Sequence, residues 1–119
     1  MLFRSDPQSI ADAAAQLTKH NLPPVLMVDC SHANSEKKFA KQEDVWRSVI
    51  QQRVEGTQSL IGMMVESHLN EGNQPILKNA ADLKYGVSIT DPCIGWDDTE
   101  RVLDTLANAV RQRRLAIAE

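Results

Sequence analysis

The segment VLMVDCSHANS, Val25–Ser35, changes character halfway along its length. Four apolar residues come first, and an acid, a thiol, a hydroxyl and an imidazole follow them directly. A short apolar run without polar alternation is typical of a β-strand that is covered on both faces. We therefore expect a buried strand over residues 25–28, with the ionisable side chain of His32 just beyond its carboxyl end.

Two later segments repeat this pattern. LIGMMV, Leu60–Val65, runs into Glu66, and VSIT, Val87–Thr90, runs into Asp91. Amphipathic helical patterns alternate with these apolar runs, and this alternation predicts an α/β fold with a parallel sheet. Folds of this kind place their active sites at the carboxyl ends of the strands.

Sequence patterns typical of helices lie before, between and after the predicted strands. Asp6-Pro7 is typical of an N-cap followed by proline at the first helical position, so we expect a helix that ends near Lys19. A second apolar stripe predicts a helix over about residues 36–55. The sequence DDTE, Asp97–Glu100, resembles a capping box with Asp97 as the N-cap of a third helix.

Composition limits the classes of function. The chain has 119 residues, 42% of them hydrophobic and 24% charged, with a net charge of −3, which indicates one soluble globular domain. The sequence lacks a basic stripe, a long apolar run and a signal peptide, so we expect no nucleic-acid partner and no membrane span. With two cysteines only, Cys30 and Cys93, a reducing cytoplasm is the expected location.

His32, Glu66 and Asp91 follow three separate strands, and the carboxyl ends of parallel strands meet at one edge of a sheet. One imidazole and two carboxylates suit a divalent ion such as Mn, Fe, Co or Zn, and three protein ligands are typical of a catalytic site. Acids and histidines at strand ends also often only cap a helix or bond loop backbone. Spacing alone leaves both interpretations open.

Three strings carry a specific resemblance: MVDCSHANSEKKF, GMMVESHLNEGNQ and KYGVSITDPCIGWDDT. In this order they resemble the C-terminal third of the metal-dependent, feedback-regulated (class I) 3-deoxy-D-arabino-heptulosonate-7-phosphate (DAHP) synthases. The resemblance implies a (β/α)₈ TIM barrel, of which residues 6–119 hold the last three β/α units. It also implies the first reaction of the shikimate pathway to the aromatic amino acids, in which phosphoenolpyruvate condenses with erythrose 4-phosphate.

The resemblance assigns roles to individual residues. It implies that His32, Glu66 and Asp91 bind the metal, and that Asp91 and Cys93 line the erythrose 4-phosphate site. The family's fourth metal ligand is a cysteine on the first barrel strand, which this sequence lacks. Because metal-bound histidines are usually oriented by a hydrogen-bonding partner, we also expect Ser31 and Asn34 to orient His32. Cys30 is expected to be a buried core residue rather than a substitute ligand.

The five residues Met1–Ser5 match nothing expected at this point of the family, and we interpret them as a non-native leader. Three strands cannot close a barrel, so we expect the chain alone to be inactive and to self-associate through open apolar edges. The full enzyme is expected to be a homo-oligomer. The alternative function is a short non-catalytic protein that binds metal, or only presents a packing surface, and associates with a full-length synthase.

Overall fold

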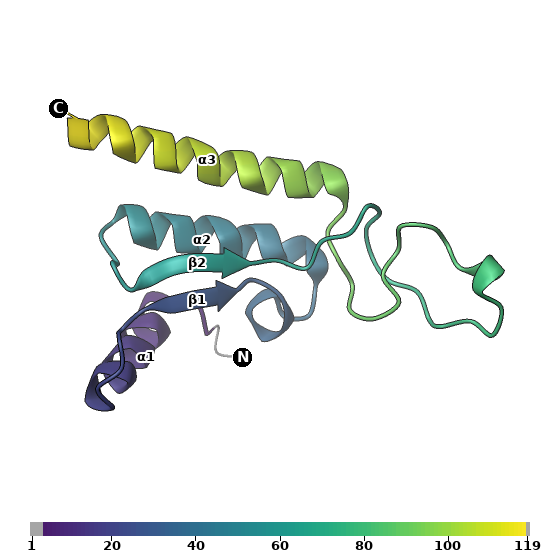
Figure 1. The fold of residues 1–119 in the computed structure, drawn as a ribbon, viewed down its shortest axis with the longest axis horizontal. Helices are drawn as coiled ribbons and strands as arrows, with labels where there is room; N and C mark the ends of the chain where they lie inside the picture. Colours follow the sequence, from purple (N-terminus) through teal and green to yellow (C-terminus); the bar gives the residue numbers. More distant parts are fainter. Residues whose placement is uncertain (1–3, 119) are drawn as a thin grey trace.

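The computed structural model describes residues 4–118, so the first three residues of the expected leader lie outside the described part. Figure 1 shows the five main elements. Along the chain they are α1 (Pro7–Lys19), β1 (Leu26–Asp29), α2 (Gln42–Val54), β2 (Leu60–Met64) and α3 (Trp96–Ala118). Short 3₁₀ turns occupy His32–Ser35 (η1), Phe39–Lys41 (η2) and Ala80–Asp82 (η3). Helix α2 contacts both β2 and α3.

The two strands pair in parallel, as expected for an α/β fold. Leu26 lies opposite Leu60 and Val28 opposite Met63, with an irregularity in the ladder after Leu26. Since α2 lies between β1 and β2 in sequence, the chain forms a β-α-β unit. This unit brings the carboxyl ends of both strands to the same edge (Figure 1).

The third strand, expected over residues 87–90, is not formed, and that prediction is wrong. Ser88 makes only an isolated bridge, to Asn73 in the loop after β2. The backbone of this segment bonds to the loop instead of to a strand, since the N–H of Gln74 donates to Ser88 O at 2.8 Å. Further along the chain, the N–H of Ile94 donates to Glu66 O, two residues beyond the end of β2, at 2.9 Å.

Helix boundaries follow the local backbone. Asp6 is the N-cap of α1, where its carboxylate accepts from Ser9 N at 2.9 Å, as the sequence predicts. The second helix begins at Gln42, six residues later than expected (42 − 36 = 6), because Glu36 and Lys37 have φ angles of 53° and 59°. Left-handed residues such as these cannot continue a right-handed helix.

The predicted capping box before α3 is also wrong. Helix α3 starts at Trp96, which places Asp97 inside its first turn rather than at the N-cap. Thr99 bonds the backbone carbonyl of Gly95 through both its N–H, at 3.0 Å, and its hydroxyl, at 2.8 Å. Acidic residues in the first turn, Asp97 and Asp98, still complement the positive end of the helix dipole.

One hydrophobic core joins the helices to the strands. The buried members are Ile10, Val28, Cys30, Val45, Trp46, Val49, Leu60, Ile94 and Val102. The indole of Trp46 also donates to Val102 O at 2.8 Å, which ties α2 to α3. Arg101 of α3 binds Glu43 of α2 at 2.6 Å, and its guanidinium, with that of Arg47, lowers the pKa of Glu43 to about 2.

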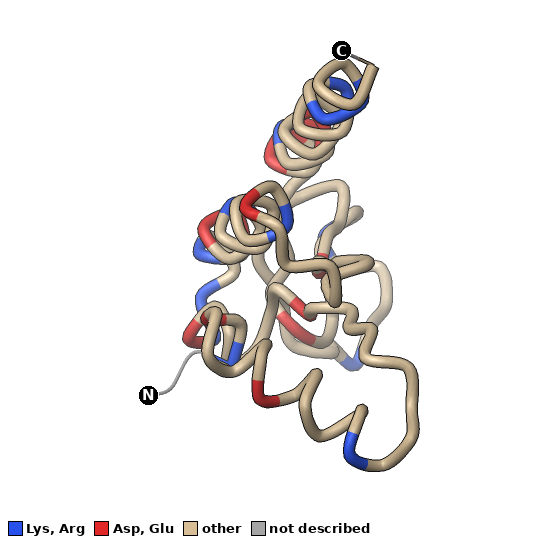
Figure 2. The backbone as a smooth tube through the Cα atoms, turned by 90° about the vertical axis from the view of Figure 1, so that its left-hand side faces the viewer, with Lys and Arg blue, Asp and Glu red and all other residues tan. Residues whose placement is uncertain are grey.

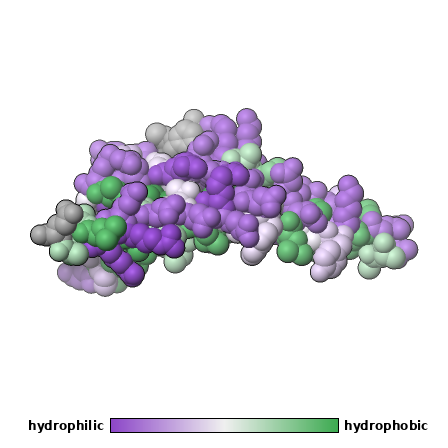
Figure 3. Space-filling model, turned by 90° about the horizontal axis from the view of Figure 1, so that it is seen from above, coloured by the Kyte–Doolittle hydropathy of each residue, from purple (hydrophilic) through white to green (hydrophobic). Residues whose placement is uncertain are grey.

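Only one face of the sheet is covered, although the apolar runs predicted strands covered on both. Met27, which is 68% exposed, and Met64, which is 40% exposed, alternate with the core-facing Val28 and Met63, so the opposite face carries an open apolar surface. The face along α3 in Figure 3 is instead mostly hydrophilic, with separate apolar patches. Figure 2 shows basic and acidic residues intermixed along the helices. Within residues 4–118, no helix is both long and apolar enough to cross a membrane.

The open sheet face predicts self-association of this chain, since exposed apolar patches drive contacts between molecules. Met27→Lys places a charge on that face and should lower the proportion of dimers and larger species in sedimentation velocity. Ile76→Lys is the control, because Ile76 is similarly exposed, at 73%, but lies in the loop before η3. Equal association of the two variants and the unchanged chain would contradict the role of this face.

Candidate metal centre

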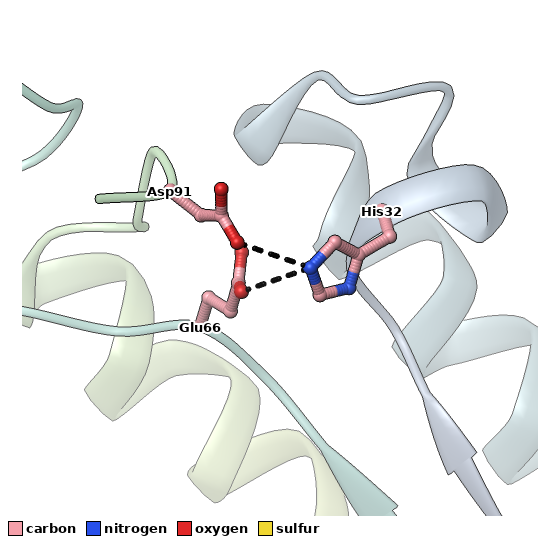
Figure 4. A group of neighbouring side chains, drawn as sticks. All are labelled: His32, Glu66 and Asp91. Atoms are coloured by element: carbon pink, nitrogen blue, oxygen red, sulfur yellow. Dashed lines mark hydrogen bonds and ion pairs between the residues drawn. The ribbon is translucent and has the colours of Figure 1, made fainter.

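Three side chains from distant parts of the chain meet beyond the sheet edge. His32 lies in η1 after β1, Glu66 lies two residues after β2, and Asp91 lies in the segment that returns to the end of β2. His32 Nε2 is 3.4 Å from Glu66 Oε1 and 3.1 Å from Asp91 Oδ2 (Figure 4). One ligand atom from each residue lies within 4.8 Å of the others.

The far side of the imidazole is held by two neighbours. Asp29 Oδ2 lies 3.0 Å from His32 Nδ1, and Ser31 Oγ lies 2.7 Å from the same nitrogen. The other oxygen of Asp29 accepts from the backbone N–H of Ser31 at 2.8 Å and from its hydroxyl at 2.6 Å. Nε2 is therefore the ring nitrogen that faces the two carboxylates.

The residues expected to orient His32 differ in what they touch. Ser31 bonds the imidazole directly. Asn34 reaches the backbone instead, since its amide donates to Asp29 O at 2.6 Å. Asp29 itself was not among the predicted site residues. An acid at the end of a strand, three residues before a histidine, is the signal that could have identified it.

Glu66 is held through its backbone by Gln42 at the start of α2. The Gln42 side chain donates to Glu66 O at 3.1 Å and accepts from Glu66 N at 2.8 Å, and it is 0% exposed. Sequence reasoning missed this contact because a glutamine in an amphipathic helix is ordinarily a surface residue. Through this pair of bonds, α2 fixes the position from which the Glu66 carboxylate projects.

Asp91 and Cys93 have different surroundings. The Asp91 side chain is 60% exposed and reaches His32. Cys93 is only 8% exposed, its thiol donates to Asp91 O at 3.4 Å, and burial raises its pKa. A cavity of about 270 Å³ adjoins the three converging residues, and Cys93 does not line it. The residues that line this cavity are Ser31, His32, Ser35, Lys37, Phe39, Gln42, Glu66, Asp91 and Pro92.

Negative charge dominates the electrostatics of this group. Partial burial raises the pKa of Glu66, and the nearby charges of Asp91 and Asp29 raise it further, while His32 opposes the shift. Hydrogen bonds to Asp29 and Asp91, together with the charge of Glu66, raise the pKa of His32. Three carboxylates around one imidazole thus favour a positive charge at the point where the side chains meet.

The donor set fits a divalent cation. One imidazole nitrogen and two carboxylate oxygens suit ions such as Mn, Fe, Co or Zn, and three protein ligands leave coordination positions for substrate. Cys30 is not positioned to join them. It is 0% exposed within the core, as expected, and burial raises its pKa to about 12, which disfavours the thiolate that metals bind.

The fold and the site together define an α/β protein with a candidate divalent-metal centre at the carboxyl ends of its strands. A family model described as the DAHP synthetase I family matches residues 3–104. The chain belongs to this family. The family is generally metal-dependent, which agrees with the donor set of the site.

Individual relatives agree with this assignment. The chain is 49% identical over 112 residues to a tyrosine-inhibited phospho-2-dehydro-3-deoxyheptonate aldolase of Schizosaccharomyces pombe, covering 92% of this chain and 30% of that protein. It is 53% identical over 105 residues to the Phe-sensitive aldolase of Escherichia coli, covering 88% of this chain and 30% of that protein. The chain thus spans about a third of the length of these relatives.

A solved structure gives the same result. The phospho-2-dehydro-3-deoxyheptonate aldolase of Francisella tularensis superposes with a TM-score of 0.83 at 36% sequence identity. The match covers 91% of this chain and 31% of that one. The arrangement of elements described above is therefore that of one part of a DAHP synthase.

The contact between Gln42 and Glu66 yields a test of stability. Gln42→Leu leaves the N–H of Glu66 without its acceptor and leaves Ile94 N–H as the donor to Glu66 O, at a cost of roughly 1–3 kcal/mol in the free energy of unfolding. Urea denaturation measures the change. Gln51→Leu is the control on the same helix, because Gln51 is exposed and bonds only locally, to Glu55 at 2.7 Å. Equal stability of the two variants would remove the structural role of Gln42.

Proposed function

We propose that this chain forms the C-terminal part of a class I DAHP synthase, and that His32, Glu66 and Asp91 bind the divalent metal of that enzyme. The convergence of these three side chains from three separate segments is the observation that carries the proposal. The site lies where (β/α)₈ barrels place their active sites, beyond the carboxyl ends of the strands.

The proposed reaction joins phosphoenolpyruvate to the aldehyde of erythrose 4-phosphate, adds one water molecule and releases inorganic phosphate. A divalent cation held here would act as a Lewis acid on the aldehyde oxygen. His32 would present Nε2, while Glu66 and Asp91 would supply the charge that holds the cation. Asp91 and the adjoining cavity would face erythrose 4-phosphate, and we assign Cys93 the more distant role of shaping the Asp91 segment.

The remaining parts of the enzyme would complete the site. The fourth metal ligand, a cysteine, and most of the phosphate-binding arginines and lysines would come from barrel strands that precede this part in the family. The exposed face of β1 and β2 would then be covered by the rest of the barrel. We further propose a cytoplasmic homo-oligomer, and the two buried, unpaired cysteines support a reducing compartment.

The alternative function is a non-catalytic protein that associates with a full-length synthase. The open apolar face around Met27 and Met64 favours it, since that face could pack on another protein. The two functions differ in whether residues 6–119 can support the chemical step when the rest of a barrel is supplied.

A chimera tests this difference. The matching part of the Escherichia coli Phe-sensitive aldolase is replaced by residues 6–119, at 53% identity over the aligned region. We expect phosphate release from phosphoenolpyruvate that depends on erythrose 4-phosphate. Glu66→Gln should abolish it. Glu55→Gln, a matched change at an exposed position after α2, should leave it intact.

Folding of the chimera is checked by its circular dichroism and oligomeric state, and Mn²⁺ binding by calorimetry. A folded, Mn²⁺-binding chimera without activity would contradict the catalytic proposal and favour the non-catalytic alternative. Activity that survives Glu66→Gln would contradict the metal role of that residue.

A further inference from the structure

The carboxylate of Asp29 lies behind His32, on the side opposite Glu66 and Asp91. We propose that Asp29 is the positioning residue of His32: it holds the proton of the imidazole on Nδ1 and so leaves the lone pair of Nε2 directed at the cation site. This inference rests on the proposed function of His32 as a metal ligand. It assigns the role to a residue outside the three converging side chains.

Both oxygens of Asp29 are engaged in holding the turn after β1. Oδ2 lies 3.0 Å from His32 Nδ1. Oδ1 accepts from Ser31 N at 2.8 Å and from Ser31 Oγ at 2.6 Å. The carboxylate is thus fixed by two donors at one oxygen and faces the imidazole with the other.

The hydroxyl of Ser31 strengthens the effect on the proton. Its single hydrogen is committed to Asp29 Oδ1 at 2.6 Å, so it offers only lone pairs to His32 Nδ1 at 2.7 Å. Nδ1 therefore faces two acceptors, the Ser31 oxygen and Asp29 Oδ2. Nε2 also faces two acceptors, Asp91 Oδ2 at 3.1 Å and Glu66 Oε1 at 3.4 Å, but the acceptors at Nδ1 lie closer. A neutral imidazole therefore holds its proton on Nδ1, and Nε2 then has a free lone pair.

The backbone shows that this turn needs support. His32 has a φ angle of 53°, in the left-handed region that residues other than glycine rarely adopt. The two bonds from Ser31 to Asp29 close the turn, and the Asn34 amide anchors the carbonyl of Asp29 at 2.6 Å. Asp29 thus connects the end of β1 to the ring of His32, which is how orienting carboxylates act on metal-binding histidines.

Asp29→Asn separates this role from a purely structural one. The amide oxygen can still accept from Ser31, which preserves the turn, but the NH₂ group then faces Nδ1 as a donor. Nδ1 must become an acceptor, and the proton moves to Nε2, the nitrogen required for the cation. We expect the affinity for Mn²⁺, measured by calorimetry on the 119-residue chain, to fall about 10–100-fold.

The second measurement reads the proton directly. Nitrogen-15 NMR of the histidine rings, recorded above the pH at which the His32 signals show that its ring has lost its charge, reports which nitrogen is protonated in the metal-free chain. We expect the Nδ1–H form for His32 in the unchanged protein and the Nε2–H form in Asp29→Asn. His20 and His68 serve as internal controls, and Asp82→Asn, in the distant η3 turn, as a matched variant.

The outcomes separate the inference from the proposed function. An unchanged tautomer in Asp29→Asn overturns the inference, whether or not the affinity falls, because a lost affinity would then come from the shape of the turn. A changed tautomer with an unchanged affinity overturns it as well. An unchanged protein that fails to bind Mn²⁺ contradicts the proposed function, while a tautomer change would still support control of the His32 proton by Asp29.

Discussion

The parallel pairing of β1 with β2 is the constraint on which the site depends. Because the strands run in the same direction, the residues that follow them, His32 and Glu66, leave the sheet at one edge. Ile94 then bonds the backbone of Glu66, which brings the preceding Asp91 to the same place. An antiparallel pair would separate the first two side chains by the length of the strands. Sheet direction therefore produces the cluster from residues far apart in sequence.

A second layer of polar contacts orients the side chains that the sheet brings together. Asp29 and Ser31 act on the ring of His32, while Gln42 holds the backbone of Glu66 from α2. Such contacts matter because a long or exposed side chain otherwise samples several rotamers, and each would move its ligand atom. The Asp91 side chain, 60% exposed, has fewer such restraints and closes the site from the loop side.

The sequence predicted the features that depend on local pattern. The first two strands follow from apolar runs, and α1 with its Asp6 cap follows from the pair Asp6-Pro7. The position of His32 and Glu66 at one sheet edge follows from the parallel pairing that these runs predict. The absence of a strand over residues 87–90 was not predictable, because the backbone partner of this segment is the loop around Asn73 rather than a neighbouring strand. Similarly, the late start of α2 reflects two left-handed residues that hydrophobic periodicity does not reveal.

Spacing alone left open whether His32, Glu66 and Asp91 share a metal site, and the family resemblance favoured that interpretation. The structure places the three side chains close enough to bind one ion. The central claim is that these residues form one cation site. Diffraction at the manganese absorption edge, from crystals of the chain grown with Mn²⁺, tests it most directly. The account predicts an anomalous peak bounded by His32 Nε2 and the carboxylates of Glu66 and Asp91. A peak elsewhere, or no peak between these three groups, would contradict it.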